Sequence, residues 1–202
     1  MRVRSPVVVP LALAAMLAGC SLGGMLGGGG KAPATLLTLA PEIPSPGEFQ
    51  RAATAGQAVT INAPLIRKEL RTLRVPVQLT PTDIQYVTDA QWVDTPDRLF
   101  QDLLSETVRR RTNRVVLDPR QTTLDPGLIV SGELQRFGYD AASGQVLVRF
   151  DAALSTTGGT RVETRRFEAS APSDGSAASI GPALNRAANE VAIEAADWIG
   201  SR

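Results

Sequence analysis

The sequence predicts an α+β fold, in which two amphipathic helices pack on a mixed, mostly antiparallel sheet. Residues 95–113 and 180–199 carry apolar side chains at helical spacing. Three long segments, 127–139, 145–155 and 160–170, are separated by glycine-containing turns, which is typical of an antiparallel meander. Because a sheet with one apolar face must be covered, both helices are expected to pack against it.

Four short strands are expected before the first helix. The apolar runs at 36–39 and 58–61 are each soon followed by a proline, which ends the strand. Segments 77–79 and 84–87 alternate apolar and polar residues, as half-buried strands do. Prolines and glycines in residues 41–57 predict a loop after the first of these strands.

The connection at 65–75 is expected to be basic and exposed, with room for one helical turn. It mixes apolar residues with four cationic ones, Arg67, Lys68, Arg71 and Arg74. The arginines are a candidate contact for anionic lipid head groups, which would make vesicle binding depend on salt.

The first helix has the clearest boundaries. Thr95 is a good N-cap, Pro96 suits the first helical position, and Asp97 favours the positive end of the helix. Its apolar face consists of Leu99, Phe100, Leu103, Leu104 and Val108. Arg109–Arg111 fall in the last turn and Asn113 is expected to close it. A solvated helix end is favoured here over a site for phosphate or lipid head groups.

A buried strand at 114–117 and the meander complete the expected sheet. Ser143-Gly144 and Gly158-Gly159 supply the two turns of the meander. The last helix carries apolar residues three and four positions apart: Ile180, Leu184, Ala187, Val191, Ala195, Trp198 and Ile199. Both helices are therefore expected to form the core rather than to bind a partner.

The N-terminus has the layout of a secretory signal that ends at the chain's single cysteine. Two arginines begin it, residues 5–17 form an apolar stretch, and two small residues precede Cys20. The stretch is well short of the roughly 20 residues that span a bilayer. The sequence Leu17-Ala18-Gly19-Cys20 resembles the lipobox of bacterial lipoproteins. That resemblance implies cleavage before Cys20 and attachment of lipid to its thiol.

Three parts of the chain follow from this assignment. Residues 1–19 are the lipoprotein signal peptide, residues 20–34 are the lipid-carrying Cys20 and a glycine-rich tether, and residues 35–202 are the folded domain. The tether composition predicts a flexible coil with ends about 20 Å apart. Ser21 follows the cysteine where bacterial sorting uses Asp for retention at the inner membrane. The resemblance therefore implies the outer membrane, facing the periplasm.

The amino-acid composition excludes several classes of chemistry. The chain has 21 basic residues, 20 acidic residues and no histidine. Loss of the signal peptide removes Arg2 and Arg4, so the mature chain is almost neutral and no nucleic-acid partner is expected. Histidine-dependent catalysis and histidine metal sites are excluded, and a lipid-modified Cys20 leaves no thiolate for catalysis or zinc. Neither a cofactor nor a metal is expected.

Several stretches resemble the ABC-type transport auxiliary lipoproteins. They are the lipobox, the run Leu36-Leu37-Thr38-Leu39-Ala40-Pro41, and the segment from Ile84-Gln85-Tyr86 through Gln91-Trp92-Val93-Asp94-Thr95-Pro96 to Leu99. The strand-rich second half and the final helix ending in Trp198-Ile199 fit as well. The sequence departs from the family in having leucine at 36 and 37, where a tyrosine is usual, and in its arginine-rich connection at 65–75.

The resemblance implies a non-enzymatic, lipid-anchored component of a lipid transport system at the outer membrane. Its implied partners are a mammalian-cell-entry domain protein, a permease and an ATPase, and a homo-oligomer is left open. Tyr86 and Trp92 are the candidate partner interface because exposed aromatic residues make good anchors. The alternative for Trp92 is that it packs over the start of the helix at Pro96.

Two rival interpretations remain. An assembly or pilotin-type lipoprotein would share the anchor but bind a β-barrel or a secretin. A periplasmic hydrolase would need two carboxylates facing each other in a cleft, one with a raised pKa. Its candidate acids are Asp94, Asp97, Glu133 and Asp151.

Overall fold

A computed structural model describes residues 35–45, 47, 50–118, 125–159 and 161–202. The chain separates into two units, Met1–Ala32 and Pro33–Arg202, and all described residues belong to the second. In chain order its elements are β1 (Ala58–Ile61), β2 (Leu65–Ile66), the 3₁₀ helix η1 (Lys68–Leu70), β3 (Arg74–Gln78), β4 (Ile84–Gln91), α1 (Pro96–Arg111), β5 (Val115–Leu117), β6 (Gly127–Asp140), β7 (Gln145–Thr156), β8 (Val162–Pro172) and α2 (Ala177–Gly200).

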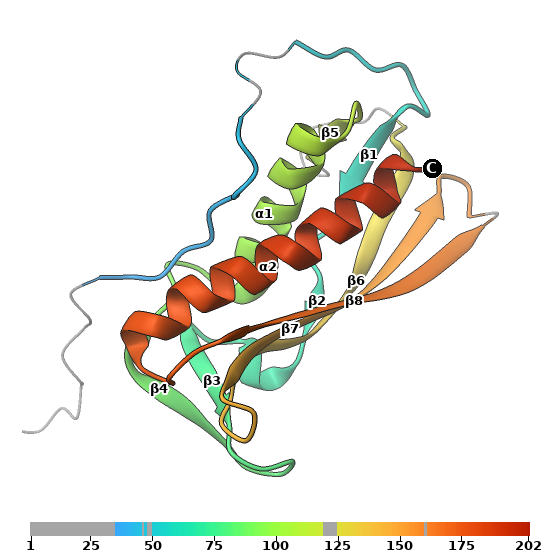
Figure 1. Ribbon diagram of the computed structural model, residues 1–202. Helices are drawn as coiled ribbons and strands as arrows, with labels where there is room; N and C mark the ends of the chain where they lie inside the picture. The colour runs from blue at the N-terminus through green and yellow to red at the C-terminus, as the bar shows by residue number, and fades with distance from the viewer. Residues whose placement is uncertain (1–34, 46, 48–49, 119–124, 160) are drawn as a thin grey trace, which may run out of the picture. The chain divides into compact units, whose positions relative to one another are not determined.

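Strand β6 is the centre of the sheet (Figure 1). It pairs along its length with β7, which in turn pairs with β8, and both ladders are antiparallel. Its other edge is shared by β1, β2 and β3, each of which runs parallel to it. Shorter ladders join β1 to β5 and β3 to β4. The sheet is therefore mixed with its longest ladders antiparallel, which confirms the predicted fold class and the predicted meander.

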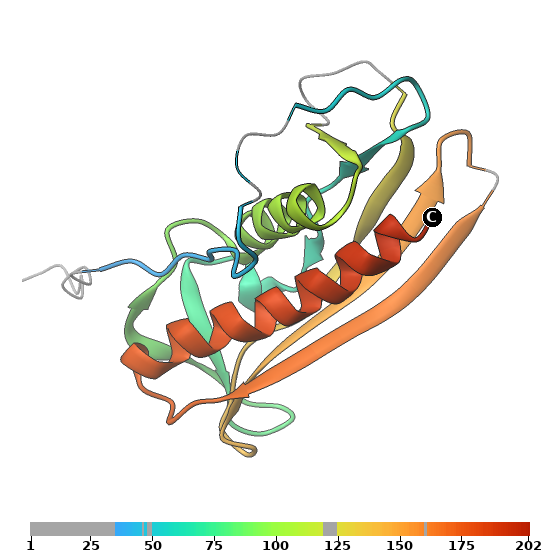
Figure 2. The same ribbon diagram turned by 45° about the horizontal axis from the view of Figure 1, so that its top comes forward.

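Both helices cover the same face of this sheet (Figure 2). Phe150 of β7 and Phe167 of β8 are cross-strand partners, so their side chains point to one face. Phe100 of α1 lies 5.1 Å from the Phe150 ring, and Trp198 of α2 lies 5.7 Å from the Phe167 ring, centroid to centroid. The core therefore fills the layer between the sheet and the two helices, as the apolar spacing of the helices predicted.

The predicted strand at 36–39 is wrong. Only Leu37 pairs there, as an isolated parallel bridge to Trp92. The chain then turns onto α2, where Asn185 Oδ1 accepts a hydrogen bond from the Ala40 amide at 2.8 Å. Asn189 accepts from the Glu42 amide at 2.8 Å and donates to the Ala40 carbonyl at 2.9 Å. Side chains of the helix thus satisfy backbone groups of the segment that follows the predicted strand.

The remaining boundaries differ in smaller ways. The connection at 65–75 holds the expected helical turn, η1, and also the two-residue strand β2. Strand β4 runs beyond 84–87 to Gln91. Thr95 is the N-cap of α1 by position, but its side chain makes no capping hydrogen bond. Thr112 rather than Asn113 is the C-cap, because its backbone amide and hydroxyl both donate to the Val108 carbonyl.

Candidate interaction surfaces

Cys20, the predicted lipid attachment site, lies outside the described residues. The rest of the tether, residues 21–34, lies outside them as well. Within the described ranges, no helix is long and apolar enough to cross a membrane.

Trp92 is a core residue and does not present its side chain to a partner. It is 0% exposed, and its ring centroid lies 5.4 Å from that of Phe137 on β6. The expectation of an exposed aromatic anchor is therefore wrong for this residue. The reason is the position of Trp92 between two segments: its backbone is bonded to Leu73 on one side and flanked by Leu37 on the other. This arrangement places the indole inside the sheet–helix layer.

Tyr86 of β4 is half-buried at the junction with η1. Its hydroxyl donates to the Glu69 carbonyl at 3.3 Å. The Arg74 guanidinium carbon lies 4.3 Å from the ring centroid, which is a cation–π contact. Tyr86 therefore connects β4 to η1 and holds Arg74 at the surface. The buried Trp92 does not contribute to this surface.

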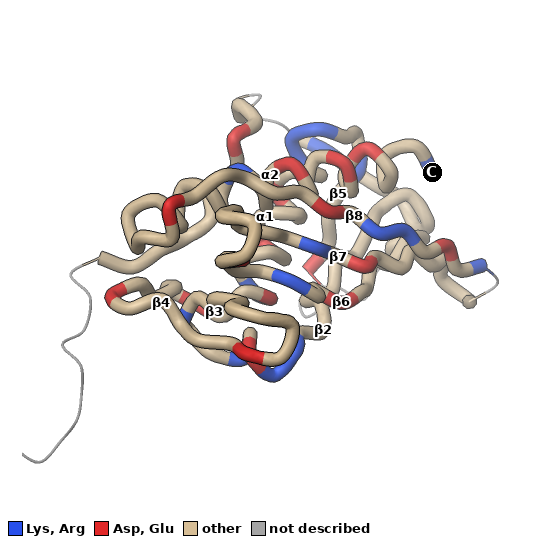
Figure 3. The backbone as a smooth tube through the Cα atoms, turned by 60° about the horizontal axis from the view of Figure 1, so that its bottom comes forward, with Lys and Arg blue, Asp and Glu red and all other residues tan. Residues whose placement is uncertain are grey.

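The connection between β2 and β3 forms a cationic surface, which we call the basic segment (residues 65–74). Arg67, Lys68, Arg71 and Arg74 are all exposed, whereas Glu69 is half-buried. Two leucines in the segment are exposed too, Leu65 at 73% and Leu73 at 40%. Figure 3 shows its Lys and Arg positions beside β2 and β3, on the side away from α2.

The arginine triplet at the end of α1 is held by acidic and carbonyl partners. Arg109 and Arg110 both bind Glu106, and Arg110 also donates to the Ile43 carbonyl at 2.6 Å. The hydrogen bond that Arg110 donates to Glu106 lowers the pKa of the Glu106 carboxyl. Arg111 forms a two-pronged ion pair with Asp197 of α2. These contacts fix the two helices and the N-terminal segment to one another, which supports the structural interpretation of the triplet.

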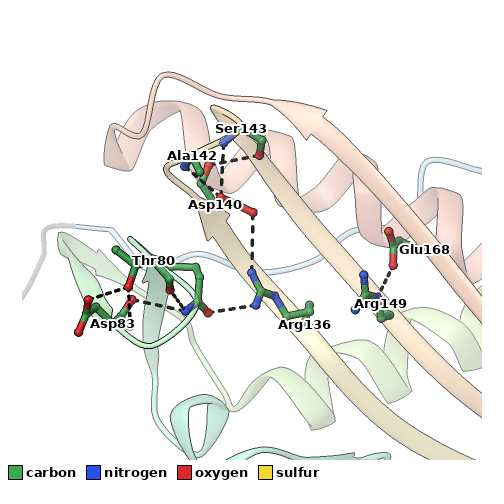
Figure 4. A network of polar contacts seen from close by, with 9 residues as sticks. Thr80, Asp83, Arg136, Asp140, Ala142, Ser143, Arg149 and Glu168 are labelled. Atoms are coloured by element: carbon green, nitrogen blue, oxygen red, sulfur yellow. Dashed lines mark hydrogen bonds and ion pairs between the residues drawn. The ribbon is translucent and has the colours of Figure 1, made fainter.

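The sheet face away from the helices carries a ladder of ion pairs that the sequence analysis missed. Arg166 of β8 binds both carboxylate oxygens of Asp151 on β7, at 2.6 and 2.7 Å. The next pair, Arg149 with Glu168, appears in Figure 4 together with Arg136, which contacts Asp140. The sequence signal was present in part, since every second residue is apolar from Val146 to Leu154 of β7 and from Phe167 to Ala171 of β8, and charged residues such as Arg149, Asp151 and Glu168 stand between them. The strand register was needed to pair them.

The carboxylates proposed for a hydrolase do not form an acid–base pair in a cleft. Glu133 and Asp151 are cross-strand partners on this solvent-facing side of the sheet. The hydrogen bond from Arg166 lowers the pKa of Asp151, whereas a general acid needs a raised one. Asp94 and Asp97 lie elsewhere, at the start of α1.

Comparison with known proteins agrees with this architecture. The family model described as the ABC-type transport auxiliary lipoprotein component matches residues 38–196. The chain belongs to this family. The match covers the sheet and most of both helices, so the resemblance seen in the sequence is confirmed.

Two solved structures show the same fold in distant sequences. One is a crystal structure of a Xanthomonas campestris protein assigned to family DUF330. It is 17% identical with a TM-score of 0.69, over 83% of this chain and 95% of that one. The other, an uncharacterized protein, is 11% identical with a TM-score of 0.58, over 75% of this chain and 95% of that one. No curated protein sequence matches the chain.

Proposed function

We propose that this chain is a non-enzymatic, lipid-anchored periplasmic component of an ABC-type lipid transport system, which docks the transport complex at the outer membrane. The observation that carries the proposal is the family match over residues 38–196, together with an N-terminal sequence that resembles a secretory signal and a lipobox. In this account the lipid on Cys20 anchors the domain and residues 21–34 give it reach.

The proposed role is passive. The sequence contains no Gly-x-x-x-x-Gly-Lys-Ser/Thr motif, so ATP is hydrolysed by a separate subunit. The proposed partner is a mammalian-cell-entry domain protein, which works with a permease and that ATPase. The folded domain binds the far end of their periplasmic conduit. Copurification of these subunits would distinguish this function from an assembly or pilotin role. In that role the chain would copurify with a β-barrel or a secretin instead.

The anchor is tested by replacing Cys20 with serine in the full-length chain. We expect the Cys20→Ser chain to keep its signal peptide, to lack acyl groups by mass, and to leave the outer-membrane fraction of a density gradient. A matched variant, Ser21→Asp, keeps the lipid by mass but moves to the inner-membrane fraction. A Cys20→Ser chain that stays in the outer-membrane fraction, and whose mass differs from that of the native mature chain only by the exchange of sulfur for oxygen, would contradict the anchor.

A further inference from the structure

The basic segment combines two properties that a merely solvated loop does not need. Its charge is strongly one-sided, because Arg67, Lys68, Arg71 and Arg74 stand against a single acid, Glu69. Its exposed leucines are interspersed with that charge, Leu65 before Arg67 and Leu73 between Arg71 and Arg74. Cationic side chains flanked by exposed apolar ones match the lipid–water interface, where the cations meet anionic head groups and the apolar groups enter the acyl boundary.

The segment also lies beside the point where the described chain begins. The Leu37 amide donates to the Gln91 carbonyl at 2.7 Å, and the Trp92 amide donates to the Leu73 carbonyl at 2.7 Å. The start of the domain is therefore two strand spacings, about 10 Å, from the end of the basic segment. Leu36 and Val93, each 53% exposed, lie at this same edge and extend its apolar surface.

The length of chain before this edge is compatible with a membrane contact. Residue 35 lies fifteen residues after Cys20. A fully extended chain of that length spans at most about 50 Å. A lipid on Cys20 therefore confines this edge of the domain to the neighbourhood of the bilayer. Confinement of this kind raises the effective concentration of a second, weak binding site.

We propose that the basic segment, residues 65–74, is a second membrane contact that binds an anionic phospholipid surface. The inference rests on the proposed lipid anchor and deepens it, because the contact orients the domain on the membrane. Each basic side chain near an anionic surface strengthens binding by about fivefold. Lys68 and Arg71 are the cations to replace, since Arg67 lies 3.8 Å from Glu133 and Arg74 lies against the Tyr86 ring, so that replacing either of these would also remove a contact within the domain.

The test uses a fluorescent reporter on the lipidated full-length chain. Lipid occupies the only native cysteine, so Leu65→Cys creates a unique thiol for an environment-sensitive dye. The labelled chain is reconstituted into phosphatidylcholine vesicles with and without phosphatidylglycerol. We expect a blue shift of the dye, and its quenching by spin-labelled lipid, in anionic vesicles at low salt only. A dye at Glu194→Cys, on the exposed side of α2, is expected to show neither change.

Charge variants decide whether the basic segment causes the effect. We expect Lys68→Gln with Arg71→Gln to reduce the bound fraction of the dye about tenfold or more. The matched control, Arg98→Gln with Arg186→Gln, removes the same charge from exposed positions on the two helices. It is expected to leave the bound fraction of the dye unchanged. Equal dye spectra in neutral and anionic vesicles would overturn the proposal, as would equal effects of the two double variants. The mass of the chain reports separately whether Cys20 carries lipid, so failure of the anchor is distinguished from failure of this contact.

Discussion

The two aromatic residues singled out from the sequence have different environments, which single-residue reasoning could not distinguish. Tyr86 and Trp92 stand six positions apart, Tyr86 within strand β4 and Trp92 directly after it. Trp92 is fully buried against Phe137, whereas Tyr86 is half-buried under Arg74. The difference arises because Leu37 and Leu73 flank Trp92 on both sides, and neither neighbour is close to it in the sequence.

Replacing the two residues with alanine tests this difference in burial. We expect Trp92→Ala to lower the free energy of unfolding by about 3–5 kcal/mol, since it leaves a cavity in the core. Tyr86→Ala is expected to cost clearly less, because solvent already reaches that ring. Urea denaturation of both variants measures the difference. Equal losses would contradict the core position of Trp92.

At the scale of elements, the long helix α2 does more than cover the sheet. Asn189 is 1% exposed in the middle of this helix, where its side chain bonds the backbone of Ala40 and Glu42. Asn185, one turn earlier, bonds the Ala40 amide and the Glu42 carboxylate. The spacing of the two asparagines is visible in the sequence, but nothing there indicates that they hold a segment about 145 positions away. The expected strand at 36–39 is present only as the single bridge from Leu37 to Trp92.

Removing the Asn189 amide tests this attachment. We expect Asn189→Ala to lower the free energy of unfolding by about 1–3 kcal/mol, because the Glu42 amide and the Ala40 carbonyl lose their side-chain partner. The Glu42 amide, which donates to Asn189 Oδ1, is expected to exchange with solvent faster than in the native chain, whereas the Ala40 amide, which donates to Asn185 Oδ1, is expected to change less. Hydrogen exchange measures both sites. Asn185→Ala is the comparison at a half-buried position and is expected to affect stability less. Unchanged exchange at Glu42 in Asn189→Ala would contradict the attachment.

The N-terminus of α2 is expected to be sensitive to acid through Asp174. Hydrogen bonds from the Ser179 and Ser176 side chains and from the Ser176 amide lower the pKa of Asp174 to about 2. A carboxyl whose folded pKa lies below its unfolded value stabilises the fold at neutral pH. That contribution is lost as the pH falls from about 5 to 2.

We expect Asp174→Asn to show a smaller loss of thermal stability on acidification than the native chain. Ser179→Ala, which removes the largest cause of the pKa shift, is expected to behave in between. Melting temperatures across this pH range measure both variants. An Asp174→Asn chain that retains the full native loss between the two ends of the range would contradict the role of this carboxylate.

At the scale of the whole molecule, the sequence predicted the elements with local signals and missed the contacts between distant segments. The capped helix from Pro96, the glycine turns of the meander and the final apolar helix all lie in continuous stretches, and all are present. The parallel pairing of β1, β2 and β3 with β6 joins segments far apart in the chain. No local pattern of apolar and polar residues indicates which distant segments will pair. The basic segment was visible as a charge run, but its position beside the domain start depends on the backbone contacts of Leu37 and Leu73 with the end of β4 and Trp92.

The most direct test of the account is a crosslinked pull-down of the lipidated chain from its own membranes, followed by mass spectrometry. The account predicts recovery of a mammalian-cell-entry domain protein together with a permease and an ATPase. It also predicts that the Cys20→Ser chain recovers less of them, because that chain no longer reaches the outer membrane. Recovery of only an outer-membrane barrel or a secretin would contradict the proposed transport function and favour an assembly role.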